Sequence, residues 1–377
     1  MRLLSKIEDI SAYAEVNKHK VKDLMVEGVI PAIINESTNR SFFYTTDTLI
    51  DFTAKRIAKS KNIEYDNNNR ELFLFDDLSP DIFKSSGTCE VFSVTNQKGG
   101  VSKTSISVNL SATLSLLNQR VLLIDTDSQA QSSRYLNNEI YTDRSIANVL
   151  LEVLHSKTIT KELVEKYIIR NEVVNGKCID ILPSELSLSK IFELCRSVSM
   201  PHTLVKKIID TIKDSYDMVI CDLPPNSGIS IEMALYASDK VIFATDCDIF
   251  AKEGIEVTLE GINNFNQNTN KDLVIDTCFI SKYNKNARIH NTVRDETIEL
   301  LVDNGIHKDD IRTIPYNLIV PESQHESYAL IGFFQKESYS AKSESVSYSS
   351  TISQAILANE QFFEYAIKMI NDKEENI

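Results

Sequence analysis

Residues Ser93–Thr104 read SVTNQKGGVSKT, and this stretch decides the fold. An apolar run over residues 91–94 precedes the glycine pair, and apolar residues at helical spacing follow from Ile106 to Leu114. The pattern predicts a strand, a phosphate-binding loop and a helix.

The polar residues of this stretch suit a nucleotide. Gly99 and Gly100 allow a tight turn whose backbone N–H groups point at one spot, and the N-terminus of the next helix favours an anion there. Lys103 would reach the β- and γ-phosphates, and the Thr104 hydroxyl would bind Mg²⁺. We therefore predict that ATP and Mg²⁺ bind here.

The match to the generic P-loop, G-x-x-x-x-G-K-[ST], is partial. Ser102 stands where that pattern has a glycine, and a second lysine, Lys98, precedes the glycine pair. The sequence K-G-G-V-S-K-T resembles the deviant Walker A motif of the ParA/MinD family of ATPases. In that family the early lysine crosses a dimer interface to the nucleotide of the other subunit, so the resemblance implies a homodimer joined by ATP. An ordinary glycine-rich turn is the alternative.

The ATP-binding residues predicted in this stretch are Lys98, Gly99, Gly100, Val101, Ser102, Lys103 and Thr104.

Two acidic motifs follow apolar runs. In VLLIDTDSQAQSS, Asp125 and Asp127 close a predicted strand, and in DMVICDLPPNSG Asp222 closes another, as in a Walker B strand. The resemblance implies that Asp127 orients the attacking water and that Asp125 helps to position Mg²⁺. Ser128 stands where the family usually has proline. Acids merely solvated at strand ends are the alternative.

The predicted catalytic residues are Asp127, Lys103 in cis and Lys98 in trans, and the predicted metal site is Thr104, Asp125 and Asp222.

From residue 89 onward, apolar runs alternate with helical stretches. We expect strands at Val91–Thr95, Arg120–Asp125, Cys178–Leu182, Asp217–Asp222, Lys240–Thr245 and Leu273–Ile280. The alternation predicts an α/β fold with a mostly parallel sheet and helices on both faces, the fold of a deviant Walker P-loop ATPase. Ligands of such sheets bind at the carboxyl ends of strands, where all three motifs lie. An amphipathic helix is expected over Ile352–Ile370.

Residues 1–60 are predicted to form a small winged helix-turn-helix domain. A short helix over residues 7–14, a turn at Val16–Asn17 and a helix over Lys18–Met25 precede Gly28 and a polar wing. This order resembles the DNA-binding module of MerR-like regulators and the N-terminal domain of the larger plasmid ParA proteins, which repress their own operon. A small helical lobe with a solvated basic face is the alternative.

The domain boundaries follow as 1–60, a linker over 61–88, and an ATPase domain over 89–377. The DNA contacts predicted in the first domain are Lys18, His19, Lys20, Lys22 and Arg40.

Two later stretches carry weaker signals. Ile314–Asn317 occupies the adenine-side position of the family, so Pro315 and Tyr316 are predicted to line the base, a strand-ending turn being equally compatible. Residues 282–294 are basic in an acidic chain, which predicts contact with DNA of any sequence, against a merely solvated helix face. The DNA contacts predicted here are Lys282, Lys285, Arg288 and Arg294.

Composition restricts the class of protein. The chain has 377 residues and a net charge of −14, so DNA contact requires local basic patches. Six scattered cysteines favour buried free thiols over metal sites or disulfides. No long apolar stretch or signal peptide is evident and the end of the chain is acidic, which predicts a cytoplasmic, nucleoid-associated protein without a membrane role.

These features together predict a plasmid partition ATPase of the ParA type. It would form an ATP-dependent dimer, bind nonspecific DNA, be stimulated by a ParB-like centromere-binding partner, and bind its own operator through the N-terminal domain. The main alternative is an ATP-sensing transcriptional repressor without a segregation role. A MinD-like positioning ATPase is disfavoured by the acidic tail.

Overall fold

A computed structural model describes residues 3–4, 10–12, 17–26, 33–34, 43–46, 54–55, 58, 88–137, 141–156, 158–174, 177–225, 228–330 and 348–375. Arg40 and residues 61–87 of the predicted linker lie outside this part of the chain.

The described residues from Cys89 onward contain one eight-stranded sheet, in the order β11-β10-β9-β4-β8-β5-β7-β6. Its strands are β4 (Glu90–Thr95), β5 (Val121–Asp125), β6 (Ile169–Val174), β7 (Lys177–Leu182), β8 (Met218–Asp222), β9 (Lys240–Asp246), β10 (Val274–Tyr283) and β11 (Ile311–Pro315). Neighbouring strands are parallel except β6 and β7. The predicted mostly parallel sheet is confirmed, with β6 and β11 as additional edge strands.

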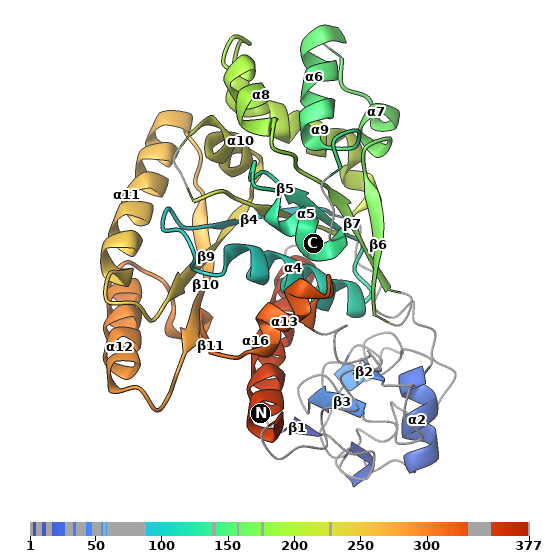
Figure 1. The fold of residues 1–377 in the computed structure, drawn as a ribbon, viewed down its shortest axis with the longest axis vertical. Coiled ribbons are helices and arrows are strands. Elements are labelled where there is room, and N and C mark those ends of the chain that lie inside the picture. The colour runs from blue at the N-terminus through green and yellow to red at the C-terminus, as the bar shows by residue number, and fades with distance from the viewer. Residues whose placement is uncertain are drawn as a thin grey trace.

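Helices cover both faces of the sheet, as predicted (Figure 1). One face carries α4 (Lys103–Leu116), α13 (Ile319–His325) and α16 (Tyr348–Glu375). The other carries α6 (Ile146–Ser156), α8 (Leu188–Cys195), α9 (Leu204–Ile212), α10 (Ile229–Ala237), α11 (Ala251–Thr269) and α12 (Arg288–Asp303). Shorter helices are α5 (Gln131–Asn137), α7 (Lys161–Glu165), η3 (Pro201–Thr203), η4 (Lys213–Ser215) and η5 (Lys308–Asp310).

Helix α4 is buried between the sheet and α16, although it is rich in serine and threonine. Two of its buried hydroxyls are satisfied inside the helix, because Ser111 and Thr113 each donate to the carbonyl four residues earlier. Burying these groups therefore leaves no donor unpaired. The loop before α4 is thus attached to a buried central helix.

The C-terminal helix α16 confirms and extends the predicted helix over Ile352–Ile370. Tyr365 is fully buried and packs edge-on against Phe279 of β10, which also contacts Phe362. Near the end of the helix, the buried Lys373 donates to the Asp217 carbonyl. Helix α16 is therefore part of the core built around the eight-stranded sheet.

The N-terminal elements, drawn in blue in Figure 1, include α2 (Lys18–Val26). Strands β1 (Leu3–Leu4), β2 (Ile33–Ile34) and β3 (Phe43–Thr46) form an antiparallel sheet in the order β1-β3-β2. The predicted helix over Lys18–Met25 is confirmed. Its assignment to a DNA-binding winged helix-turn-helix stays a prediction.

All six cysteines lie in the described part of the chain and are free thiols, and Cys195, Cys221, Cys247 and Cys278 are buried. Among the described helices, none is long and apolar enough to cross a membrane.

Candidate functional site

The loop between β4 and α4 contains two residues in the left-handed backbone region. Gly100 has a φ of 76°, and Ser102, directly before α4, has a φ of 70°. Glycine adopts this region freely, whereas it costs a residue such as serine about 1–2 kcal/mol. Ser102, which stands where the generic P-loop has glycine, thus has a backbone conformation that favours glycine. Its hydroxyl accepts a hydrogen bond from Ser281 at 3.0 Å.

Lys103 is buried in the curve of this loop. Its Nζ donates to the carbonyls of Asn96 at 2.9 Å and Lys98 at 3.0 Å. Burial lowers the pKa of Lys103, and the nearby charges of Asp222 and Asp127 oppose that change. The ammonium is held beside the loop amides by carbonyl acceptors, a geometry suited to a phosphate ligand.

Asp222, at the end of β8, is surrounded by hydroxyl donors. Its Oδ2 accepts from Thr104 at 2.8 Å and from Ser132 at 2.5 Å, and its Oδ1 accepts from Ser107 at 2.9 Å. Burial raises the pKa of Asp222, and these hydrogen bonds offset part of the rise. Thr104 and Asp222, two of the residues predicted to hold Mg²⁺, are hydrogen-bonded to each other, and their contact with the metal stays a prediction.

Asp125, the last residue of β5, and Asp127, which follows the strand, occupy different environments. Asp125 is buried, and its oxygens accept from the Asp127 amide at 3.1 Å and from the Ser133 amide and hydroxyl at 3.0 and 2.7 Å. Burial and the neighbouring charge of Asp222 raise the pKa of Asp125 to about 8. Asp127 instead lines a cavity beside the P-loop. Asp125 fixes the turn that presents Asp127, and its predicted contact with Mg²⁺ stays a prediction.

The cavity beside the P-loop has a volume of about 760 Å³, within the range of small-molecule sites. Residues Gly100–Thr104 line it together with Asp127, and Pro315 and Tyr316 line it from the end of β11. The structure therefore brings the predicted adenine-side residues to the same cavity as the phosphate loop. Ala358 and Phe362 of α16 also line it.

Lys98 is not among the residues that line this cavity. Its Nζ forms ion pairs with Asp246 Oδ1 at 3.1 Å and with Asp248 Oδ1 at 3.0 Å, at the end of β9. Partial burial lowers the pKa of Lys98, but hydrogen bonds to Asp248 and Asp246 outweigh it, so its pKa lies above the usual value. The lysine predicted to act in trans is held within its own chain here.

Comparisons with known proteins agree with this geometry. Residues 89–275 match a family model described as an AAA domain, AAA_31. The chain is 27% identical over 243 residues to the sporulation initiation inhibitor protein Soj of Bacillus subtilis, which covers 64% of this chain and 90% of Soj. It is 28% identical over 206 residues to the chromosome partitioning protein ParA of Myxococcus xanthus, covering 55% and 69%. The chain belongs to the ParA/MinD family of ATPases.

Solved structures share the fold of this ParA/MinD ATPase. A Borrelia burgdorferi B31 protein bound to AMPPNP superposes with a TM-score of 0.54 at 24% identity, covering 73% of this chain and 99% of that one. Cobyrinic acid a,c-diamide synthase of Mycobacterium smegmatis, with a bound ATP analog and magnesium, gives 0.50 at 25% identity, covering 55% and 78%.

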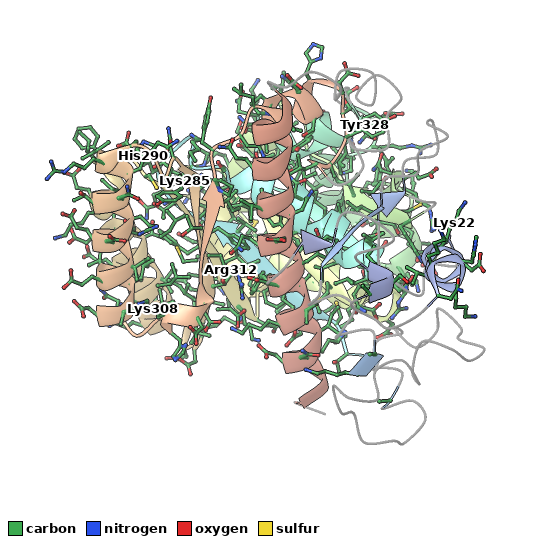
Figure 2. The ribbon with its side chains drawn as sticks, turned by 90° about the horizontal axis from the view of Figure 1, so that it is seen from below. Lys22, Lys285, His290, Lys308, Arg312 and Tyr328 are labelled. Atoms are coloured by element: carbon green, nitrogen blue, oxygen red, sulfur yellow. The ribbon has the colours of Figure 1, made fainter. Side chains whose placement is uncertain are left out.

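The residues predicted to contact DNA lie at separate places on this ParA/MinD ATPase. Figure 2 shows Lys285 near one end of α12 and Lys22 on α2, on the opposite side of the molecule. Lys285 and Arg288 are exposed, whereas the Arg294 guanidinium donates to the hydroxyl of Tyr283 and to Asp295. On α2, Lys18, His19 and Lys22 are exposed and Lys20 is half-buried.

Lys282 is separated from the other basic residues of its segment. It lies at the end of β10, lines the nucleotide cavity and donates to the Gly100 carbonyl at 2.5 Å. Its predicted contact with DNA stays a prediction, and the structure gives it a partner in the P-loop instead.

Sequence reasoning did not identify the acidic partners of Lys98. A signal was present, because Asp246 and Asp248 form a D-x-D pattern after an apolar strand, as Asp125 and Asp127 do. It also did not identify Ala358 and Phe362, for which the sequence carries no signal beyond the apolar face of a C-terminal helix.

Proposed function

We propose that this chain is a slow, Mg²⁺-dependent ATPase that hydrolyses ATP to ADP and phosphate and uses ATP-dependent dimerisation to partition plasmid DNA. The observation that carries the proposal is the cavity lined by residues 100–104 and Asp127, where Thr104 also donates a hydrogen bond to the buried Asp222. The names of relatives, a chromosome-partitioning ATPase Soj and a chromosome partitioning protein ParA, support the biological role.

The residues around the cavity divide the chemistry among them. Phosphoryl transfer to water requires positioning and charge stabilisation more than covalent catalysis. The amides of residues 99–104 would cradle the phosphates and Lys103 would neutralise the β- and γ-oxygens. Asp127 would orient the attacking water, since it lines the cavity and its Oδ1 is fixed by the Gln129 amide at 2.9 Å.

The donor set at the cavity suits Mg²⁺, which prefers oxygen ligands and binds to nucleotide sites through few protein groups. Thr104 Oγ1 and Asp222 Oδ2 would hold the ion, and Asp125 would support them by fixing the neighbouring turn. When bound, Mg²⁺ supplies positive charge to the phosphate oxygens.

The position of Lys98 supports the proposed role in trans. It is held outside the cavity by Asp246 and Asp248, so it is free to contact a nucleotide bound by another subunit once those ion pairs open. The phosphates of ATP would supply negative charge that competes with Asp246 and Asp248 for Lys98. Dimerisation would therefore require ATP, and hydrolysis would weaken it.

DNA would bind at two places. Lys285 and Arg288, with Arg294 on the same helix as Arg288, would contact nonspecific DNA in the dimer, which would associate the protein with the nucleoid in the cytoplasm. Residues 1–60, joined by the linker over 61–88 to the ATPase domain over 89–377, would bind operator DNA through the basic face of α2 and through Arg40. A ParB-like centromere-binding protein would stimulate turnover.

The catalytic part of the proposal is tested with Asp127→Ala. The variant should dimerise with ATP as the wild type does but turn ATP over at least about 100-fold more slowly, because water is no longer oriented. Sedimentation with ATP, ADP or no nucleotide measures dimerisation, and phosphate release measures turnover. Unchanged turnover would refute the role of Asp127, and a wild type that stays monomeric with ATP would refute the proposed dimer.

A further inference from the structure

Lys282 is a lysine of the nucleotide site that the P-loop pattern does not include. Its backbone is in the left-handed region, with a φ of 57°, near the end of β10, where the register with β11 shifts. This conformation is uncommon for a residue with a side chain. It accompanies the hydrogen bond from Nζ to the Gly100 carbonyl, so the ammonium is held beside the P-loop although the side chain is 47% exposed.

The Asp246 carboxylate lies between two lysines. Its Oδ1 contacts Lys98 Nζ at 3.1 Å, and its Oδ2 is 3.7 Å from Lys282 Nζ. Asp246 is buried, with a side chain only 11% exposed, whereas Asp248, the other partner of Lys98, is 46% exposed. Water can solvate Asp248 when Lys98 leaves, but it reaches Asp246 poorly.

The proposed dimer requires Lys98 to leave both acids. A buried carboxylate that loses its partner is costly, so the departure of Lys98 would be opposed at Asp246 far more than at Asp248. Lys282 is close enough to remain as the counter-ion. Its ammonium is already fixed by Gly100 and needs no large movement.

We propose that Lys282 is a positioning residue for dimerisation, which neutralises Asp246 and so frees Lys98 to cross to the nucleotide of a second copy of this chain. The inference rests on the proposed ATP-dependent dimer. When the subunits join, Asp246 would lose its ion pair with Lys98 and keep the one with Lys282.

The test is a double-mutant cycle on the dimer dissociation constant, measured by sedimentation at saturating ATP. Lys282→Met should weaken the dimer about threefold to tenfold, since Lys98 then becomes the sole counter-ion of a buried acid. Asp246→Asn should strengthen the dimer, because the charge that retains Lys98 is removed. In the Asp246→Asn background, Lys282→Met should change the constant less than twofold, because no carboxylate is left to neutralise.

Two matched variants serve as controls. Lys282→Arg keeps the positive charge and should dimerise within about twofold of the wild type, which separates the charge from the packing of the side chain. Lys308→Met removes the same charge at an exposed position before β11, at the opposite edge of the parallel strands from the P-loop, and should leave the dimer unchanged. Thermal unfolding of each variant checks that the chain is folded.

Each outcome has a distinct meaning. If the wild type does not dimerise with ATP, the proposed function and this inference both fail. If the wild type dimerises but Lys282→Met dimerises equally well, the inference alone fails. It also fails alone if Lys282→Met weakens the dimer as much in the Asp246→Asn background as in the wild type.

Discussion

Asp125 and Asp222 face each other in register on the neighbouring strands β5 and β8, and both are buried. Two close carboxylates in a poorly solvated place disfavour each other's ionised form. Each is stabilised by hydrogen bonds, from Ser133 in one case and from Thr104 and its neighbours in the other. At the scale of single residues, burial and mutual repulsion therefore raise the pKa values of both carboxyl groups.

The free energy of unfolding without Mg²⁺ should therefore depend on pH through the titration of Asp125. Its pKa of about 8 lies above the usual value near 4, so the folded state retains a proton that the unfolded chain releases. Its contribution to the free energy of unfolding is fully present below pH about 4 and is lost as the pH rises through about 8. Asp125→Asn should remove this dependence.

Urea unfolding of the wild type and Asp125→Asn between pH 5 and pH 9, without Mg²⁺ or nucleotide, checks this prediction. The difference between the two proteins should change by up to about 1 kcal/mol per pH unit. Parallel pH profiles would contradict the assignment.

The residues of the site were largely predictable, and their partners were not. The loop, Lys103, Thr104, Asp127 and Asp222 follow from motifs, because the predicted contacts with phosphate, Mg²⁺ and the attacking water require those residue types at those positions. The left-handed backbone of Ser102 and the contact between Lys282 and Gly100 depend on tertiary packing between β10 and the loop. No local pattern encodes such contacts.

At the scale of elements, the predicted strands were those with continuous apolar runs. These are the inner strands of the sheet, β10, β9, β4, β8, β5 and β7. The two missed strands, β6 and β11, lie at the edges of the sheet. Only alternate residues of β11 are buried, and its polar residues Arg312 and Thr313 interrupt the apolar run. Edge strands of this kind resemble turns in the sequence.

Helix α16 should stabilise the sheet through Tyr365. This side chain is fully buried, and its hydroxyl donates to Asp276 Oδ2 at 2.8 Å. Tyr365→Phe should lower the free energy of unfolding by about 1 kcal/mol through the lost hydrogen bond. Tyr365→Ala should lower it by about 3–5 kcal/mol, because it also leaves a cavity against Phe279.

Urea denaturation measures both variants. Tyr316→Phe is the control, since the side chain of Tyr316 is about half exposed and should cost less than about 0.5 kcal/mol. Equal stability of Tyr365→Ala and the wild type would show that α16 is not packed as described.

At the scale of the whole molecule, a chain with a net charge of −14 presents its candidate DNA contacts on two sides. Lys285 and Lys22 lie far apart in Figure 2, on α12 and α2. One DNA duplex would not neutralise both sets in a single subunit. The arrangement fits two separate DNA-binding activities, nonspecific and operator-directed.

The double variant Lys285→Glu/Arg288→Glu should weaken ATP-dependent binding to nonspecific duplex DNA at least about tenfold. It should also reduce the slope of log affinity against log salt by about 2, because two phosphate contacts are lost. Fluorescence anisotropy across a salt series measures both quantities. Lys308→Glu, at the other end of α12 in Figure 2, is the control. An unchanged salt slope would exclude this surface.

The central claim is that ATP joins two copies of this chain through Lys98 and that the joined form binds DNA. The most direct measurement is binding to nonspecific duplex DNA with ATP, ADP or no nucleotide, for the wild type and Lys98→Ala. We predict that the wild type binds only with ATP and that Lys98→Ala does not bind. If nucleotide makes no difference and only an operator fragment is bound, the claim is contradicted, and the chain is a repressor whose ATP site serves as a sensor.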